Sequence, residues 1–163
     1  TLVDFRKKVL EHHAERLEAA IYSSYRALLR KQSLVERVSI DADSCSIRLY
    51  NKADKEIAAE RLSAGERQLL AVSIMWALGK ASNQSLHVVI DTPLGRLDAT
   101  HRDKLLTRYF PEASHQVLLL STDEEINKTY YKKIKRWVSR SYVLEYDDKA
   151  MKTSVRTGYF WDN

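Results

Sequence analysis

The stretch from residue 62 to residue 98 reads LSAGERQLLAVSIMWALGKASNQSLHVVIDTPLGRLD, and it decides the fold of this chain. The turn at Ser63–Gly65 opens a helix, and the N–H groups and positive dipole at a helix start attract phosphate oxygens. Further on, Asp91 ends a short apolar run that predicts a buried strand. A carboxylate at the tip of such a strand is typical of a Mg²⁺ site. These segments together indicate half of an ATP site.

The other half of such a site is missing from the sequence. The chain has only four glycines, and no two of them frame the G-x-x-x-x-G-K-[ST] pattern of a phosphate-binding loop. We therefore expect that loop to be supplied from elsewhere.

Both motifs also have a purely structural interpretation. Ser63-Ala-Gly-Glu66 is an S-x-x-E capping box, which needs no ligand. A cap does not require Gly65, however, whereas close approach of backbone to phosphate does. Asp91 is alternatively a turn residue before Thr92-Pro93, because Pro93 ends the strand.

Composition narrows the class of protein. The chain has 163 residues, 44% of them hydrophobic, which fits one globular domain. No apolar run is long enough for a membrane-spanning helix. The single cysteine, Cys45, cannot form an internal disulfide, so a reducing cytoplasm is expected. The five histidines show no metal-ligand spacing with one another or with Cys45, and we interpret them as structural or surface residues.

The net charge of +5 hints at a polyanionic partner, and the basic excess is local. A helix with several basic residues on a shared face is expected near residues 124–138, and it is a candidate DNA-binding surface. Its basic residues are Lys128, Lys132, Lys133, Lys135 and Arg136. The alternative is an ordinary solvated face. Trp137 lies in the same window and is predicted to face the core.

The remaining elements follow from hydrophobic periodicity. Residues 2–31 predict one long helix with an apolar stripe, which we interpret as the end of a longer, truncated helix. The alternative is an ordinary packing helix. Residues 64–81 predict a helix that is apolar nearly all round and therefore buried. The stripe comprises Leu10, Ala14, Leu17, Ile21, Tyr25 and Leu28.

Strands are expected in pairs. Residues 35–40 and 46–50 alternate and predict a hairpin. Residues 141–146 and 153–157 are expected to form two closing strands. Residues 86–90 and 116–120 are continuous apolar runs, which predict parallel strands covered on both faces. A helix near residues 100–109 would join these two strands.

At this point the chain resembles the C-terminal lobe of an ABC-type ATPase head of the SMC/RecF/SbcC kind. Residues 62–68 resemble the ABC signature, and residues 88–91 resemble Walker B. Leu97-Asp98 resembles the D-loop, and residues 118–123 stand where the switch-histidine strand ends. The resemblance implies an α/β P-loop NTPase fold, with parallel core strands and a leading coiled-coil helix.

The sequences of two segments resemble one family more specifically than they resemble the superfamily. Residues 91–98, DTPLGRLD, and residues 119–126, LLSTDEEI, resemble the DndD family, the ATPases of bacterial DNA phosphorothioation (DNA sulfur-modification) systems. This resemblance implies DNA and the other subunits of such a complex as partners, and no membrane.

The resemblance also implies an arrangement of sites. Residues 1–33 would end a coiled-coil helix, and residues 34–163 would form the lobe. Walker A would lie in a separate N-terminal lobe, and two heads would sandwich two ATP molecules with Mg²⁺. Asp91 would hold Mg²⁺ through water, and Asp98 would couple the two sites. The signature residues Leu62, Ser63, Ala64, Gly65 and Glu66 would contact the partner's nucleotide.

Two positions depart from the family. Thr92 stands where a water-polarising Glu follows the Walker B Asp, and Thr122 stands where a His ends the next strand. Neither threonine is a general base near neutral pH. Hydrolysis is therefore expected to be slow, or to use another carboxylate such as Asp123 or Glu124.

Three alternatives remain open at this stage. The first is an ATP-gated DNA clamp or scaffold that does not hydrolyse ATP. The second is another SMC/RecF-like ATPase of DNA repair. The third is the nucleotide-binding subunit of a transporter, against which the long charged helix argues.

Overall fold

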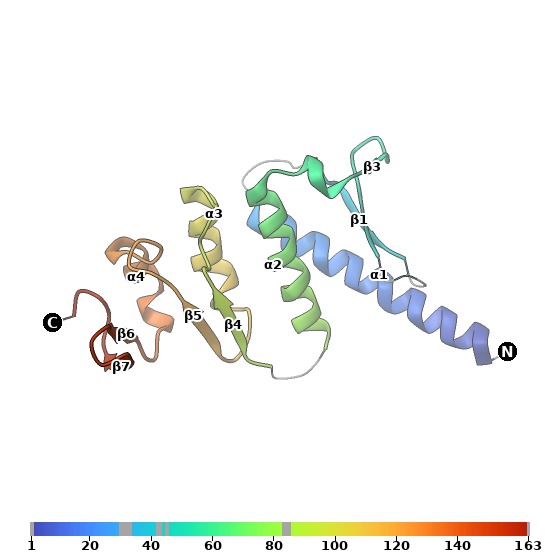
Figure 1. Cartoon of the computed structure of the whole chain (residues 1–163). Helices are drawn as coiled ribbons and strands as arrows, with labels where there is room; N and C mark the ends of the chain where they lie inside the picture. Colours follow the sequence, from blue (N-terminus) through green and yellow to red (C-terminus); the bar gives the residue numbers. More distant parts are fainter. Residues whose placement is uncertain (1, 30–33, 42–43, 45, 83–85, 163) are drawn as a thin grey trace.

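The computed structural model describes residues 2–29, 34–41, 44, 46–82 and 86–162, with side chains from residue 13 onward. The elements form an elongated arrangement with the two termini at opposite ends (Figure 1). Helix α1 (Leu2–Leu28) leads from the N-terminus to helix α2 (Ala64–Ala81), and the strands of the parallel pair lie beyond α2. None of the described helices is both long enough and apolar enough to span a bilayer.

Helix α1 contributes its last third to the core. Ile21, Tyr25 and Leu28 are completely buried, and Leu17 is half-buried against them. These residues belong to the predicted stripe, and their three- and four-residue spacing places them on one face of the helix. That face packs against α2, whose Leu69 is also completely buried.

The carboxyl end of α1 is held by two basic residues of another segment. Helix α3 (Ala99–Lys104) continues into the π-helical turn η2 (Leu105–Tyr109). Lys104 Nζ donates to the carbonyl of Leu29, and Arg108 Nη1 donates to the carbonyl of Ala27 at 3.2 Å. Cations at this end of a helix satisfy its free carbonyls and its dipole. Burial, together with the nearby charge of Arg108, lowers the pKa of Lys104.

A small antiparallel sheet covers α1. Strand β1 (Arg37–Ile40) pairs with β2 (Ile47–Tyr50), which pairs with β3 (Glu56–Ile57) and is followed by the short 3-10 helix η1 (Ala59–Arg61). The predicted hairpin is therefore confirmed. The middle of the turn between β1 and β2 lies outside the described residues.

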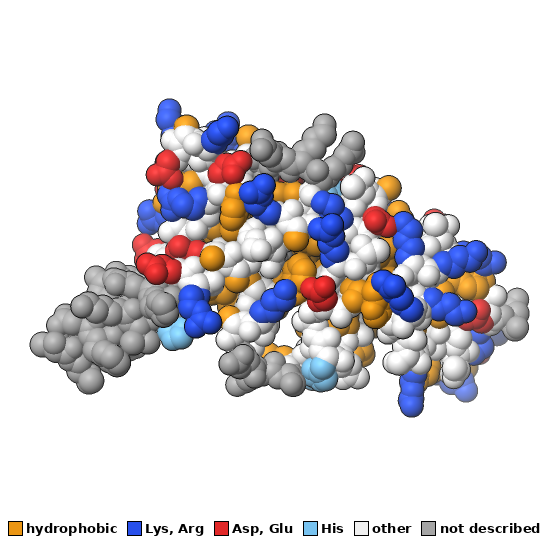
Figure 2. All heavy atoms as spheres, turned by 180° about the vertical axis from the view of Figure 1, so that it is seen from behind, with side chains coloured by type: hydrophobic (Ala, Val, Ile, Leu, Met, Phe, Trp, Pro, Cys, Tyr) orange, Lys and Arg blue, Asp and Glu red, His pale blue; other side chains and the backbone are white. Residues whose placement is uncertain are grey.

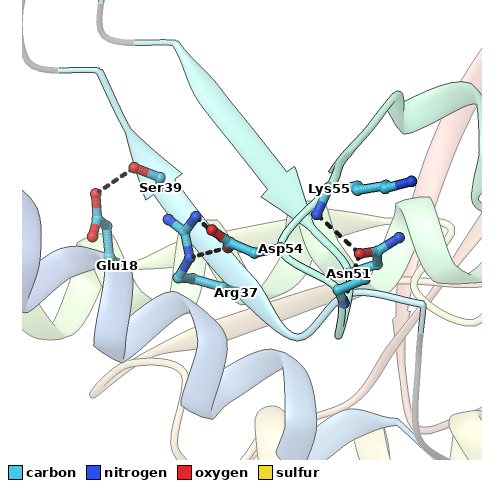
Figure 3. Close-up of polar contacts among 7 residues, drawn as sticks. Glu18, Arg37, Ser39, Asn51, Asp54 and Lys55 are labelled. Atoms are coloured by element: carbon cyan, nitrogen blue, oxygen red, sulfur yellow. Dashed lines mark hydrogen bonds and ion pairs between the residues drawn. The ribbon is translucent and has the colours of Figure 1, made fainter.

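Polar contacts fix this sheet to its surroundings (Figure 3). The guanidinium of Arg37 pairs with Asp54 at 2.7 Å, across the sheet to the turn between β2 and β3. Ser39 Oγ donates to Glu18 of α1 at 3.2 Å. Asn51 closes the turn by accepting a hydrogen bond from the backbone N–H of Lys55.

Strands β4 (Val88–Asp91) and β5 (Val117–Leu120) form the predicted parallel pair, but only one face is covered. Ile90 and Leu119 pack against the core. Val89, Leu118 and Leu120 on the opposite face are 54%, 42% and 48% exposed, so the expectation of two covered faces was wrong for this chain. Successive side chains of a strand point to opposite faces, and the described residues provide a layer over one face only.

Helix α2 shows a similar difference. Its bounds are as predicted, and Leu69, Trp76 and Ala77 are buried. Met75 and Leu78, however, are 62% and 43% exposed, so the helix is not buried all round. One flank of α2 lacks a partner element among the described residues.

The basic helix is shorter than predicted. Helix α4 (Lys128–Ile134) begins at Lys128, because the Asn127 side chain accepts hydrogen bonds from two N–H groups of the first turn. It ends in the 3-10 helix η3 (Lys135–Trp137). Residues 124 and 125 belong to a turn and residues 126 and 127 are not helical, so the predicted start at residue 124 was wrong. Trp137 is 41% exposed and carries the guanidinium of Arg136 at 3.9 Å from its ring, so its predicted core position was also wrong.

The chain ends in a second hairpin. Strands β6 (Tyr142–Asp147) and β7 (Lys152–Thr157) are the two expected closing strands, and they pair with each other in antiparallel register. The residues that follow return to the body of the lobe, where Tyr159 and Trp161 pack against Tyr131 of α4. The C-terminal segment is thereby joined to α4.

The contrast between the two flanks of α2 is testable. We expect Leu69→Ala to lower the free energy of unfolding by about 3 kcal/mol, because it leaves a cavity at a completely buried position. Met75→Ala on the exposed flank should change it by less than about 0.5 kcal/mol. Urea unfolding followed by circular dichroism measures both, and equal losses would contradict the described packing.

Candidate nucleotide site

The helix start at Ser63 is a complete capping box. Ser63 Oγ accepts from the N–H of Glu66 at 3.2 Å, and Glu66 Oε2 accepts from the N–H of Ser63 at 2.9 Å. Arg67 Nη1 donates to the carbonyl of Leu62 at 2.6 Å, which fixes the residue before the cap. Leu62 is buried, whereas Ser63 and Ala64 are exposed at the surface. The backbone therefore presents the start of α2 to solvent.

Gly65 brings this helix start against the loop that follows β4. A Cβ atom at residue 65 would lie 3.4 Å from the carbonyl oxygen of Arg96 and 3.5 Å from Leu97 Cδ2. The signature-like turn and the Leu97-Asp98 segment are thus in direct contact. The sequence places them about thirty residues apart.

Asp91 lies at the carboxyl end of β4, with an exposed side chain. The next residue, Thr92, donates its N–H to the carbonyl of Leu120 at the end of β5. Thr122 follows two residues later, so Asp91, Thr92 and Thr122 share one edge of the parallel pair. Ligands of open α/β sheets bind at this edge.

The loop from Thr92 to Asp98 is tightly bent. Thr92 and Arg96 have φ angles of 51° and 60°, in the left-handed region that is unfavourable for residues with a Cβ. A Cβ at Gly95 would lie only 3.0 Å from Thr92 Cγ2. Leu94 is completely buried and anchors the loop to the core.

Asp98 ends this loop as the N-cap of α3. Its Oδ1 accepts from the N–H of His101 at 2.9 Å and lies 3.1 Å from His101 Nδ1. The carboxylate is therefore held at the start of α3, next to the Leu97 side chain that contacts Gly65.

The turn after β5 holds a residue that sequence reasoning missed. Thr122 Oγ1 accepts from the N–H of Glu125 at 3.3 Å, and the carboxylate of Glu125 accepts from the N–H of Leu94 at 3.1 Å. Asp123 and Glu124, the predicted alternative carboxylates, are exposed on the same turn. The T-x-x-E pattern of residues 122–125 was the available signal, because it repeats the S-x-x-E pattern of residues 63–66.

Tyr159 was also missed. Its hydroxyl lies 3.0 Å from Ser121 Oγ, the residue between β5 and Thr122. Burial raises the pKa of Tyr159, so the phenol stays protonated at physiological pH. No periodic pattern in the sequence marks this contact, which joins residues 38 positions apart.

The donor atoms at this edge suit Mg²⁺. Asp91 offers a carboxylate, and Thr92 Oγ1 lies 3.4 Å from Asp91 Oδ1. Mg²⁺ prefers such oxygen ligands and takes the rest of its shell from water and phosphates. Within the described residues, no group of three His, Cys, Asp or Glu side chains forms a metal cage. Asp91 and Thr92 could therefore supply only part of the oxygen shell of a Mg²⁺ ion.

The predicted basic cluster lies on α4 and η3. Lys133 forms an ion pair with Asp103 of α3 at the surface. Lys128 lies 5.9 Å from the ring of Trp161. Lys132 and Lys135 are exposed, as is Arg136. Figure 2 shows basic side chains spread over this face of the molecule, including the end that carries the C-terminal segments.

Comparison with known proteins identifies the fold. No protein-family model matches the sequence, and no curated protein matches it either. The structure is similar to one from work on ATP-driven dimerization and DNA-stimulated activation of SMC ATPases, with a TM-score of 0.67 and 14% identity over 94% of this chain and 89% of that chain.

Two further SMC structures are similar. One is the Smc head domain of Pyrococcus yayanosii with a coiled coil and joint, with a TM-score of 0.64 and 15% identity over 88% of this chain and 26% of that chain. The other is the SMC head domain of Thermotoga maritima, with a TM-score of 0.55 and 13% identity over 89% of this chain and 48% of that chain. The chain therefore has the α/β fold of an SMC-type ATPase head, and the predicted fold class is confirmed.

The structural role of Ser63 is separable from any role in binding. We expect Ser63→Ala to lower the free energy of unfolding by about 1 kcal/mol, because it removes the acceptor for the Glu66 N–H. Ser63→Thr keeps that acceptor and should lose less than half as much. Thermal unfolding measures both variants, and an unchanged stability of Ser63→Ala would show that the capping box contributes nothing.

Proposed function

We propose that this chain is the C-terminal half of an ATP-binding and ATP-hydrolysing head that dimerises around ATP and engages DNA. The observation that carries the proposal is the contact of Gly65 with the loop between Asp91 and Asp98. That contact joins a helix start suited to phosphate with a carboxylate suited to Mg²⁺, on a fold shared with SMC heads.

Each residue has a separate role in this proposal. Ser63 and Gly65 expose the helix start, where N–H groups and a hydroxyl would contact the γ-phosphate bound by a second subunit. Leu62 anchors the turn in the core, and Ala64 and Glu66 complete its first turn. Asp91 would hold Mg²⁺ on its own subunit. Asp98 would link the two sites, because it caps α3 beside the Gly65 contact.

The proposed head depends on a Walker A lobe outside this chain. The uncovered face of β4 and β5 and the exposed flank of α2 are apolar surfaces suited to burial against such a lobe. This arrangement would also explain why the apolar sequences of β4 and β5 predict strands that are buried on both faces.

Thr92 and Thr122 favour slow hydrolysis. Both lie at the edge that carries Asp91, and neither supplies a carboxylate or imidazole to activate water. Positioning and charge stabilisation account for most of phosphoryl transfer, so turnover survives without them. Asp123 and Glu124 are exposed near this edge and are the remaining candidates for a base.

The system we propose for this head is DNA sulfur modification. The proposal is supported by the amino-acid sequences of residues 91–98 and 119–126, which resemble the DndD family. In this proposal the partners are DNA and the other subunits of the phosphorothioation complex, and the compartment is the cytoplasm. Another SMC/RecF-like DNA-repair complex is the alternative setting for the same chemistry.

A second candidate function is a DNA clamp or scaffold that binds ATP without hydrolysing it. The two threonines favour it, because they replace both groups expected around the attacking water. Steady-state phosphate release by the full-length dimer distinguishes the candidates. Turnover that is lost in Asp91→Asn would support the ATPase, and the absence of turnover with intact ATP-dependent dimerisation would support the clamp.

Placement of Ser63 opposite a partner's nucleotide predicts a specific defect. In the full-length protein we expect Ser63→Arg to bind ATP with unchanged affinity but to dimerise at least tenfold more weakly, because a bulky cation fills the space meant for the γ-phosphate. Sedimentation with a non-hydrolysable ATP analogue measures this. Ala81→Arg, at the other end of α2, is the matched control. Normal dimerisation of Ser63→Arg would refute the proposed interface.

The basic cluster generates a prediction about DNA. Lys132 and Lys135 are exposed and separated by one helical turn, so they present their charges together. We expect the double variant Lys132→Glu/Lys135→Glu to bind duplex DNA several-fold more weakly and to lower the salt slope of the ATP-bound dimer by about 1 to 2. Fluorescence anisotropy at several salt concentrations measures the slope.

The control is Lys52→Glu/Lys55→Glu in the turn between β2 and β3, which makes the same charge change at the other end of the lobe. An equal loss in both double variants would reveal a non-specific effect of net charge. An unchanged slope for the Lys132/Lys135 variant would place DNA contact outside α4.

A further inference from the structure

The chain contains two related sequence patterns that fold differently. Ser63-x-x-Glu66 forms a closed capping box, in which the Glu66 carboxylate returns to the N–H of Ser63. Thr122-x-x-Glu125 forms only half of such a box. The Thr122 hydroxyl accepts from the N–H of Glu125, but the Glu125 carboxylate crosses to the N–H of Leu94, 31 residues away. The second pattern therefore joins the two loops that follow β4 and β5.

The loop that receives this contact needs an external restraint. Thr92 and Arg96 both have left-handed φ angles, a conformation that persists only where surrounding contacts impose it. Leu94 lies between them, and a Cβ at the adjacent Gly95 would lie 3.8 Å from Glu125 Oε1. The carboxylate is half-buried here, where a charged acceptor makes a stronger hydrogen bond than a neutral one.

The restraint acts on the proposed nucleotide site from both sides. Upstream of Leu94 the loop holds Asp91 and Thr92, and downstream it holds the Arg96 carbonyl that contacts Gly65 and the Asp98 cap of α3. In the turn after β5, the backbone N–H of Glu125 donates a hydrogen bond to Thr122 Oγ1. Glu125 therefore connects the turn after β5 directly to the loop after β4, and that loop in turn contacts the start of α2.

We propose that Glu125 is a positioning residue, whose carboxylate fixes the loop from Thr92 to Asp98 in register with both Thr122 and the helix start at Gly65. This inference rests on the proposed ATPase function for its effect on turnover, but not for the contact itself. Glu125 acts here as a hydrogen-bond acceptor, so its role requires an oxygen at Oε1 and no exchange of a proton.

The substitutions Glu125→Ala and Glu125→Gln test this role in the full-length protein. Glu125→Gln keeps an oxygen acceptor for the Leu94 N–H but has no carboxylate to serve as a base. We expect Glu125→Ala to lower kcat about ten- to hundredfold with little change in KM for ATP, because the reacting groups lose their alignment. Glu125→Gln should retain most of kcat and the same pH profile. Glu112→Ala, which removes an exposed carboxylate in the turn after η2, is the control.

Hydrogen exchange provides a readout that does not depend on ATP hydrolysis. In Glu125→Ala the amide of Leu94 should exchange at least about tenfold faster, and in Glu125→Gln it should stay close to wild type. If the wild-type protein shows no turnover, the ATPase proposal fails while this measurement still decides the role of Glu125.

Two results would overturn the proposal. Unchanged exchange at Leu94 in Glu125→Ala would show that the contact does not restrain the loop. A loss of kcat in Glu125→Gln as large as in Glu125→Ala, with Leu94 still protected, would make the carboxylate itself the reacting group.

Discussion

The close approach of Gly65 to the Arg96 carbonyl is the constraint on which the rest of the site depends. A Cβ atom at residue 65 would lie 3.4 Å from that carbonyl, which is van der Waals contact, so the two segments lie against each other at this point. The start of α2 and the loop after β4 therefore share one surface. Leu62 and Leu94, one in each of the two segments, are both buried, so both segments are anchored in the core.

The core that supports this alignment is assembled from distant parts of the chain. The end of α1 and the middle of α2 bury their apolar faces against each other, and α3 with its π-helical turn closes the end of α1. A π turn widens a helix locally and often occurs where geometry is adjusted for function. Here it places Arg108 against α1, while Leu105, Leu106 and Tyr109 of the same turn remain buried.

The features predicted correctly from sequence are those that local physics determines. The helix start at Ser63 follows from a capping box four residues long, and the parallel pair follows from two short apolar runs. The predicted start of α4 was wrong because several residues could cap the helix. Asn127 is the cap in the structure, and hydrophobic periodicity does not distinguish it from residues further upstream. The Glu125–Leu94 contact was missed because it joins residues 31 positions apart.

The wrong prediction that α2 and the parallel strands are fully buried has a different cause. An apolar strand or helix indicates that its residues are buried somewhere, but not which part of the protein buries them. Val89 and Met75 are residue types usually found in protein interiors, but both are exposed to solvent on this chain. Their surfaces are consistent with a lobe that completes its core against another segment.

The long first helix has a mechanical consequence. Helix α1 has 27 residues, which corresponds to a rod about 40 Å long. The buried side chains described for it, Ile21 to Leu28, all lie near its carboxyl end. A tilt of about 10° where Lys104 and Arg108 hold that end would therefore displace the other end by about 7 Å, so the helix would amplify a small rearrangement beside Asp98 into a large movement far from it.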